Sequence, residues 1–177
     1  MRTLFLTLIN LTVFFNLQAQ DVAMLDASSN INLSNNNHYF KISNSDYFFS
    51  VNNFNLPEVV KELQQEVAKY DIKTKDVYDN SEPGIYDVQL KKGKHNISLT
   101  FDNNGEIISS KEVYKNIALP QYLRVKLAKR FPKWAIVKTR LTVNYFYNKN
   151  LQVLYIVKLQ NEKKNKTIYI NDVGEFI

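Results

Sequence analysis

The side chains that could do chemistry are few, and they lie far apart in the chain. The two histidines, His38 and His95, are 57 positions apart, and neither has a set of candidate metal ligands near it in the sequence. A zinc site draws three or four ligands from histidine, cysteine and carboxylate side chains, and this chain has no cysteine. We therefore expect no metal and no cofactor, and we expect His95, in the turn KKGKHN, to be an exposed surface histidine.

The stretch DNNGE at residues 102–106 is similar to the beginning of a calcium-binding loop. A complete loop needs oxygen ligands that continue to a later glutamate, and Glu112 stands at the wrong offset. A second copy of the stretch, at the end of the chain, has Asn171 in place of the aspartate. A tight turn is the favoured interpretation of both stretches.

No other pattern indicates catalysis. Asp76 and Asp79 are close in sequence, but they lie among lysines, and nothing suggests a raised pKa for either carboxyl group. The chain has only four glycines, which leaves no glycine-rich phosphate loop, and it has no G-x-S-x-G nucleophile elbow. The sequence therefore predicts no catalytic residue, and an enzyme is the least favoured function.

The beginning of the chain, MRTLFLTLINLTVFFNLQAQ, has the pattern of an export signal. Arg2 provides a positive start, an apolar run with few interruptions covers residues 4–17, and Ala19 is a small residue where cleavage is expected. We predict a signal peptide at residues 1–19, cleaved after Ala19 or within a residue or two of it. The protein is then periplasmic or secreted, without a stable membrane anchor. An uncleaved N-terminal anchor is the alternative.

Composition narrows the function further. The absence of cysteine excludes a lipoprotein anchor, a disulfide framework and a thiol nucleophile, so the exported protein must be held together by packing alone. Its 45% hydrophobic and 13% aromatic content makes that feasible. The net charge is +6, with scattered lysines and one denser run, NEKKNK at 161–166, which we interpret as a solvated turn. Export and the lack of a recognition motif argue against nucleic acid.

The chain contains the same pattern twice. At a shift of 69 residues, YDVQL (86–90) falls on YIVKL (155–159), and Gly105-Glu106 falls on Gly174-Glu175. Upstream the shift is 63, where Leu56-Pro57 falls on Leu119-Pro120. The difference of six indicates a longer connection in the second copy, at YFYNKNLQ (145–152).

Each copy predicts a helix followed by strands. Apolar residues at spacings of three and four form one stripe after each proline: Val60, Leu63, Val67 and Tyr70 in the first copy, and Leu123, Leu127, Ala128 and Phe131 in the second. The predicted strands cover 72–78, 84–90, 96–102 and 107–114, then 135–143, 153–159, 166–170 and the final EFI. Because side chains alternate along a strand, the face that packs on the helix in the first copy carries Tyr86, Val88, Leu90, Ile97, Leu99 and Phe101.

The predicted fold is therefore α+β: two tandem helix-plus-antiparallel-sheet repeats that form one sheet of about eight strands with two helices on one face. The expected organisation is a signal peptide at 1–19, an N-terminal extension at 20–55, and repeats at 56–118 and 119–177. Residues 20–37 are rich in Asn and Ser and lack periodicity, so we expect poor order there, followed by short strand-like pieces in HYFKISNSDYFFSV (38–51).

The order of features in this chain resembles that of a known family. The features are Leu-Pro, an amphipathic helix, Tyr-x-Val-x-Leu and a glycine turn, and they occur twice after an export signal. They look like the PepSY-like, β-lactamase-inhibitor-protein-like tandem domains common in Bacteroidetes envelopes. The similarity covers residues 56–177 and includes FPKWAIV (131–137). It implies two helices against one sheet of about eight strands, in exported proteins of mostly unknown role that are sometimes proposed to bind or restrain envelope proteins. No catalytic residues accompany the family, and none is carried over.

The sheet face away from the helices is the candidate binding site. In the first copy this face is polar, whereas in the second it carries an apolar and tyrosine-rich group: Tyr145, Tyr147, Leu154, Ile156 and Tyr169. Such side chains suit a protein-binding surface. The alternative is that residues 38–51 lie across this face and bury it.

We predict a monomeric, non-catalytic binding module that engages or inhibits another envelope protein through its sheet. A small-ligand carrier is the alternative, and it would require an enclosed pocket between helix and sheet.

Overall fold

The computed structural model describes residues 42–79, 81 and 83–177. The predicted signal peptide and the first part of the N-terminal extension, up to residue 41, lie outside the described residues. In the part of the chain that is described, no helix combines the length and the apolar character needed to cross a membrane.

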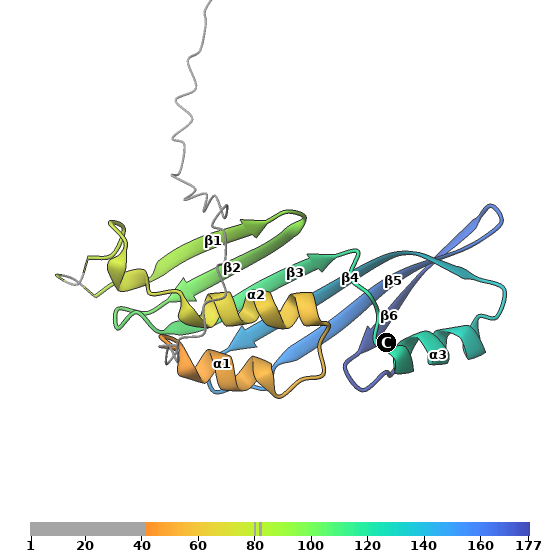
Figure 1. Cartoon of the computed structure of the whole chain (residues 1–177), viewed down its shortest axis with the longest axis horizontal. Coiled ribbons are helices and arrows are strands. Elements are labelled where there is room, and N and C mark those ends of the chain that lie inside the picture. The colour runs from red at the N-terminus through yellow and green to blue at the C-terminus, as the bar shows by residue number, and fades with distance from the viewer. Residues whose placement is uncertain (1–41, 80, 82) are drawn as a thin grey trace, which may run out of the picture.

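Six antiparallel strands form one sheet, and their order across the sheet is their order along the chain (Figure 1). They are β1 (Tyr86–Lys92), β2 (His95–Phe101), β3 (Ile107–Lys115), β4 (Ala135–Phe146), β5 (Gln152–Asn161) and β6 (Lys164–Asn171). Every strand pairs only with its neighbours in sequence.

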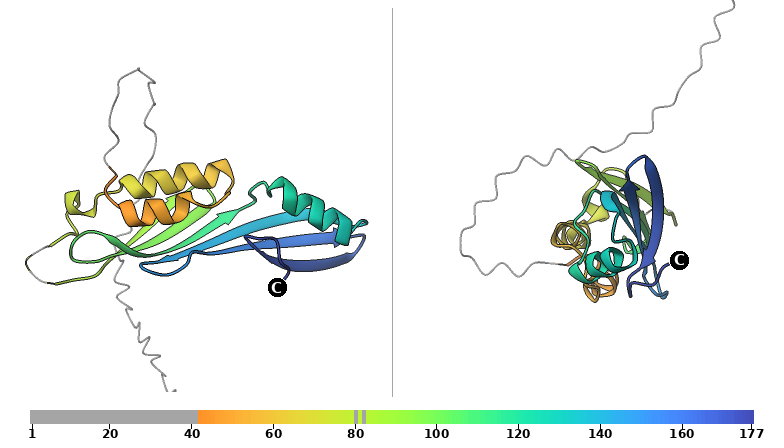
Figure 2. Two further views of the ribbon diagram at one scale, coloured as in Figure 1. Left: turned by 90° about the horizontal axis from the view of Figure 1, so that it is seen from below. Right: turned by 90° about the vertical axis from the view of Figure 1, so that its right-hand side faces the viewer.

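The α-helices of the described residues all lie on one face of this sheet, and none of them lies on the other face (Figure 2). They are α1 (Ser45–Asn52), α2 (Glu58–Lys69) and α3 (Gln121–Arg130). Helices α1 and α2 lie side by side, with α1 packed on β3 and β4 in the middle of the sheet, and α3 lies over the C-terminal half (Figure 1). The prediction of an α+β fold with an antiparallel sheet and helices on one face is confirmed. The predicted number of two helices is wrong for the described residues, because α1 is a third.

The predicted number of about eight strands is wrong for the described residues. Residues 72–78 form a short 3-10 helix, η1 (Ile72–Thr74), and turns rather than a strand. The carboxylate of Asp71 accepts a hydrogen bond from the Lys73 N–H at 3.0 Å, and this local capping competes with an extended conformation. At the C-terminus, EFI forms only an isolated bridge between Phe176 and Ile170.

Residues 45–51 are helical and not strand-like, which corrects the second part of the prediction for the extension. Tyr47 and Val51 are four residues apart, and residues at this spacing lie on the same side of a helix. This spacing decides the conformation. Both side chains are buried, whereas Phe49 is exposed. The aromatic residues of this stretch have a high propensity for strands, and the prediction of strand-like pieces depends on that propensity. Contacts with the rest of the fold override that propensity.

The two longer helices begin as predicted, each directly after a proline. Pro57 and Pro120 have φ angles of −57° and −52°, which suit a helix start. Helix α2 buries the predicted stripe of Val60, Leu63 and Val67. Helix α3 buries only Leu123 and Leu127, and the predicted Ala128 is exposed. Helix α3 is therefore held by a narrower contact than α2.

The predicted inward face of the first copy is confirmed. Val88, Ile97, Leu99 and Phe101 are buried, and the two remaining positions, Tyr86 and Leu90, are half-buried on the outermost strand. The second half contributes its own buried row: Leu141, Val143, Val153, Tyr155, Val157, Leu159, Ile168 and Ile170. The core thus lies between the sheet and the helices along its whole length.

The two glycine turns have the same geometry. Gly105 and Gly174 adopt φ angles of +73° and +81°, a region that strongly favours glycine. In the first turn, Asp102 accepts hydrogen bonds from the N–H groups of Asn104 and Glu106, both at 2.9 Å. In the second, Asn171 accepts one from the Glu175 N–H at 2.7 Å. The carboxylate of Asp102 therefore stabilises its own turn, as the sequence predicted.

Candidate protein-binding face

The face of the sheet opposite the helices, called here the outer face, brings together three of the five predicted site residues. Leu154 and Ile156 alternate with the buried positions of β5, and Tyr169 does so on β6. Ile156 lies directly opposite Tyr169 across the two strands. Tyr169 is 45% exposed, and Leu154 and Ile156 are half-buried.

The prediction for Tyr145 is wrong, because this residue points to the helix side. It alternates in phase with the buried Leu141 and Val143 on β4, and only 1% of its surface is exposed. Its ring meets the ring of Tyr47 edge to face, with centroids 5.4 Å apart. Burial raises the pKa of Tyr145 to about 12.

Tyr147 is 50% exposed but lies away from the other three residues. It follows the end of β4, where Phe146 pairs with Ser109 of β3. Leu154 pairs instead with Thr142, four residues earlier on the same strand. Four residues of strand correspond to roughly 13 Å, so Tyr147 does not belong to the same patch.

Positive charges flank the apolar residues on the outer face. Strand register places Lys115 directly opposite Arg140, and Lys138 directly opposite Lys158. Like charges that face each other across a sheet are destabilising. Among the outer-face positions of β3 to β6, all of which are described, there is no carboxylate to offset them.

We define the outer patch as four apolar and four charged residues that lie next to each other by this register: Val113, Leu154, Ile156, Tyr169, Lys115, Lys138, Arg140 and Lys158. The cations come from three strands, β3, β4 and β5, so no local sequence pattern reveals that they lie together. The composition of the second half of the chain does indicate this positive charge. Residues 119–177 hold twelve Lys and Arg against three Asp and Glu.

No described segment covers the outer patch. The alternative in which residues 38–51 lie across it is wrong for residues 45–51, because α1 packs on the helix side. Residues 38–41 lie outside the described part. The described C-terminal segment stays at the free edge of β6, where the Ile177 N–H donates to the Tyr169 carbonyl at 3.0 Å.

A cluster of polar side chains, separate from the outer patch, lies inside the core around Glu112. This fully buried carboxylate on β3 accepts four hydrogen bonds: from the hydroxyls of Tyr47 and Ser110 at 2.8 Å, the Gln64 amide at 2.8 Å and the Tyr114 hydroxyl at 2.7 Å. Burial raises the pKa of Glu112, while these four bonds act in the opposite direction. No cation takes part. The cluster joins α1 and α2 to the sheet.

His95 is half-buried, whereas the sequence predicted an exposed residue. Its Nδ1 accepts a hydrogen bond from the Lys115 N–H at 3.3 Å, and its ring lies 5.7 Å from that of Tyr114. Partial burial, together with the charge of Lys94, lowers the pKa of His95. No carboxylate joins it. In the described ranges, no group of three or more His, Asp or Glu side chains is placed to hold a metal ion.

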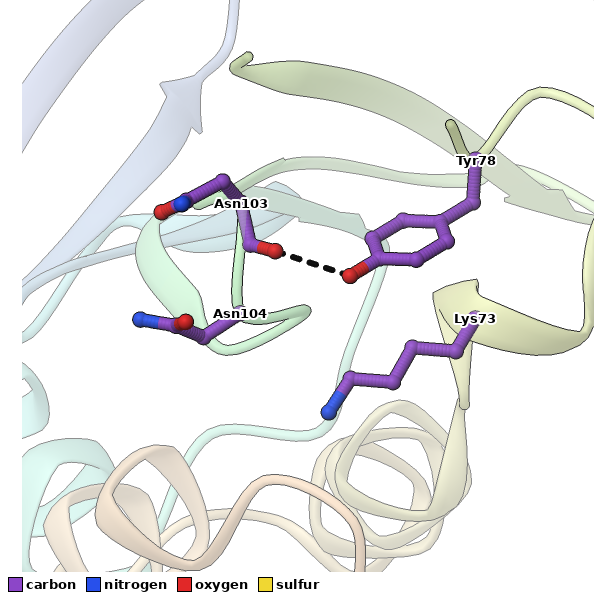
Figure 3. A pocket seen from close by; sticks show the side chains of 4 residues that line it. All are labelled: Lys73, Tyr78, Asn103 and Asn104. Carbon is purple, nitrogen blue, oxygen red and sulfur yellow. Dashed lines mark hydrogen bonds between the residues drawn. The ribbon is translucent and has the colours of Figure 1, made fainter. Parts of the chain in front are cut away.

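A wide polar depression lies beside the glycine turn of β2 and β3 (Figure 3). It has a volume of about 750 Å³ and is lined by Lys73, Tyr78, Asn103 and Asn104. The Tyr78 hydroxyl donates to the Asn103 carbonyl at 2.8 Å. The Lys73 side chain lies close to Gly105, where an added Cβ would fall 2.6 Å from the lysine Cε. These contacts hold the turn against η1.

Comparison with models of protein families, with curated proteins and with solved structures finds no match to this chain.

Proposed function

We propose that this protein is a non-catalytic, exported binding module that engages an acidic partner protein through the outer patch. One observation supports this most directly: two cross-strand pairs of like charge, Lys115 with Arg140 and Lys138 with Lys158, flank uncovered apolar side chains. In the isolated protein these pairs cost stability. A partner with carboxylates at matching positions would neutralise them and would bury Ile156 and Tyr169 at the centre of the contact.

We also propose that residues 56–118 and 119–177 are two copies of one PepSY-like unit. Each contains a helix after Leu-Pro, three strands and a glycine turn, which follows the second strand in residues 56–118 and the third strand in residues 119–177. The geometry of the two helix starts and of the two turns, at Gly105 and Gly174, supports this proposal. In this view the copies have diverged on the outer face, where the second has become basic and apolar. The proposed location, periplasmic or secreted, depends on the export signal predicted at residues 1–19.

Charge reversal at the outer patch should weaken binding while it stabilises the free protein. We expect Arg140→Glu to reduce affinity for the partner about tenfold or more, because attraction to an acidic surface becomes repulsion. The same change should raise the free energy of unfolding by about 0.5 kcal/mol, because it replaces a like-charge pair with an ion pair to Lys115. The partner is first captured with the tagged protein from an extract of the source cells, and its affinity is then measured by calorimetry.

Lys129→Glu, on the exposed side of α3, is the matched control, because it changes the net charge equally on the opposite face of the molecule. It should leave affinity within about twofold of the original. Ile156→Ser with Tyr169→Ser should abolish binding with little change in melting temperature. Equal losses with both charge reversals, or a captured partner with no acidic surface, would contradict the proposal. A large stability loss with intact binding in the serine double variant would show that these side chains serve packing alone.

A further inference from the structure

Strand β1 has an edge that no described strand pairs with. It is the first strand of the sheet, and β2 is its only partner among the described strands. The opposite end of the sheet differs, because the C-terminal segment bridges to β6 through Phe176 and Ile170. A free strand edge presents unpaired backbone N–H and C=O groups, to which an extended peptide can add as a further strand.

An apolar pocket adjoins this edge on the helix side. Leu63 and Val67 of α2 line it, together with Tyr70 directly after that helix. Leu90 of β1 and Ile97 of β2 line its other side. Its volume is about 240 Å³, whereas small-molecule sites usually measure roughly 300–1,000 Å³. The pocket is therefore small for a complete ligand of that kind and large enough for one apolar side chain. It lies where a side chain of an added strand, pointing to the helix side, would enter.

The rim of the pocket is positively charged overall. Lys92 forms an ion pair with Glu66 across the gap between β1 and α2, with Nζ and Oε1 2.5 Å apart. Lys91, the next residue on β1, is exposed, and Lys94 lies in the turn that follows. With Glu66 already paired, this end of β1 attracts acidic groups. It also disfavours a second copy of the same edge, since two lysine-bearing strands would then face each other.

We propose that β1 and this pocket form a peptide-binding site, distinct from the outer patch. An extended segment of a partner protein adds to the edge of β1, inserts one leucine-sized side chain between α2 and Leu90, and places acidic residues near Lys91 and Lys94. The backbone supplies the strand pairing, and the pocket selects the residue at one position. The site lies on the helix side of the N-terminal half, so it can be occupied independently of the outer face.

The probes are four kinds of synthetic peptide with blocked ends, the fourth of which is made in two forms, added to the full-length protein. The first is DSTLTSD, in which leucine is the only large apolar residue and aspartates stand at both ends. In the second, alanine replaces the leucine. In the third, lysines replace the aspartates. The fourth repeats the first with N-methyl groups on alternate amides, which removes strand hydrogen bonds from one edge of the peptide; both sets of alternate positions are made. Binding is followed by isothermal calorimetry at low salt.

We expect the leucine peptide to bind about 10- to 100-fold more tightly than the alanine peptide, as burial of one leucine side chain predicts. The lysine peptide should bind more weakly than the aspartate peptide. One of the two N-methylated forms should lose binding at least tenfold, while the other retains it, because only one edge of an added strand faces β1.

Two variants at neighbouring positions locate the site. Leu90→Trp fills the pocket and should reduce affinity at least tenfold, whereas Gln89→Trp, on the opposite face of the same strand, should change it less than about threefold. Thermal unfolding of both variants verifies that they fold. Failure of the leucine peptide to bind at about 1 mM, equal losses with both variants, or tolerance of both N-methylated forms would overturn the proposal. So would a concentration-dependent dimer that only Leu90→Trp abolishes, because the edge would then belong to a second copy.

Discussion

Replacing Glu112 with alanine is expected to lower the free energy of unfolding by about 4 kcal/mol, one of the largest losses available in this protein. The substitution removes the acceptor for four buried donors, on Tyr47, Gln64, Ser110 and Tyr114, and leaves a cavity where the carboxylate was. Each buried donor without a partner costs about 1–3 kcal/mol, although re-pairing among the hydroxyls reduces the sum. Urea unfolding followed by circular dichroism measures the loss.

The matched control is Lys111→Ala, one residue earlier on β3 and exposed on the outer face. It should change stability by less than about 0.5 kcal/mol. If Glu112→Ala cost no more than this control, the four hydrogen bonds would not be what holds α1 and α2 on the sheet.

Glu112→Gln should separate the carboxyl's charge from its hydrogen bonds. The glutamine amide retains an acceptor for Gln64 and Tyr114, and the hydroxyls of Tyr47 and Ser110 can rotate to accept its N–H groups. Burial raises the pKa of Glu112 in the folded protein above its ordinary value of about 4.5, so the unfolded chain ionises first as pH rises. The contribution of Glu112 to stability is therefore greatest below about pH 4.5 and falls as pH rises towards the folded-state pKa.

The glutamine variant lacks this titration. Its stability relative to the original protein should improve as pH rises from about 4.5 to the folded-state pKa of Glu112 and stay constant above it, when both are measured by urea unfolding at constant ionic strength. The comparison cancels contributions from other groups, such as Asp79, whose pKa is lowered by hydrogen bonds from Ser81. A difference that is constant with pH would mean that Glu112 titrates alike in the folded and unfolded states.

The second large effect is expected at Leu123, which is fully buried and provides half of the buried contact of α3. Leu123→Ala should cost about 3 kcal/mol, through lost apolar burial and the cavity that remains. Its side chain also packs near the last glycine turn, where a Cβ added to Gly174 would lie 3.3 Å from it. Because Leu127 is the only other buried residue in α3, we expect the helix to open locally before the protein unfolds.

Hydrogen exchange tests this local opening. The amides of α3 should exchange faster in Leu123→Ala. The exchange rates of the amides of β2 and β3 should change only as much as the change in global stability predicts. Val125→Ala, on the exposed side of the same helix, should change stability by less than about 0.5 kcal/mol. Uniform acceleration across all strands would instead indicate that α3 unfolds only together with the sheet.

Local sequence patterns predicted much of this fold because the features concerned are decided locally. Pro57 and Pro120 mark helix starts, Gly105 and Gly174 mark turns that require a positive φ, and strict alternation from Ile97 to Phe101 identifies the buried face of a strand. Each of these signals depends on a few neighbouring residues and on backbone geometry alone.

The misassigned elements depend on contacts between distant parts of the chain. Residues 45–51 carry aromatic side chains that suit either a strand or a helix, and the buried Glu112 that receives Tyr47 is 65 positions away. The prediction for Tyr145 is wrong because β4 continues to Phe146. Side chains therefore alternate between the two faces up to the end of β4, and Tyr145 falls on the buried face. Lys115 lies opposite Arg140 because of the register between β3 and β4. The sequence of either strand alone does not determine that register.

The agreement between strand order and chain order has a consequence for how the protein is made. Only the pairing of β3 with β4 closes a longer connection, which contains α3, and each of the other hairpins can form against the strand before it as the chain leaves the ribosome or an export channel. Such zippering keeps a growing edge exposed until the last strand arrives. We expect refolding to be rapid, and chains truncated before β6 to aggregate through the open edge of β5.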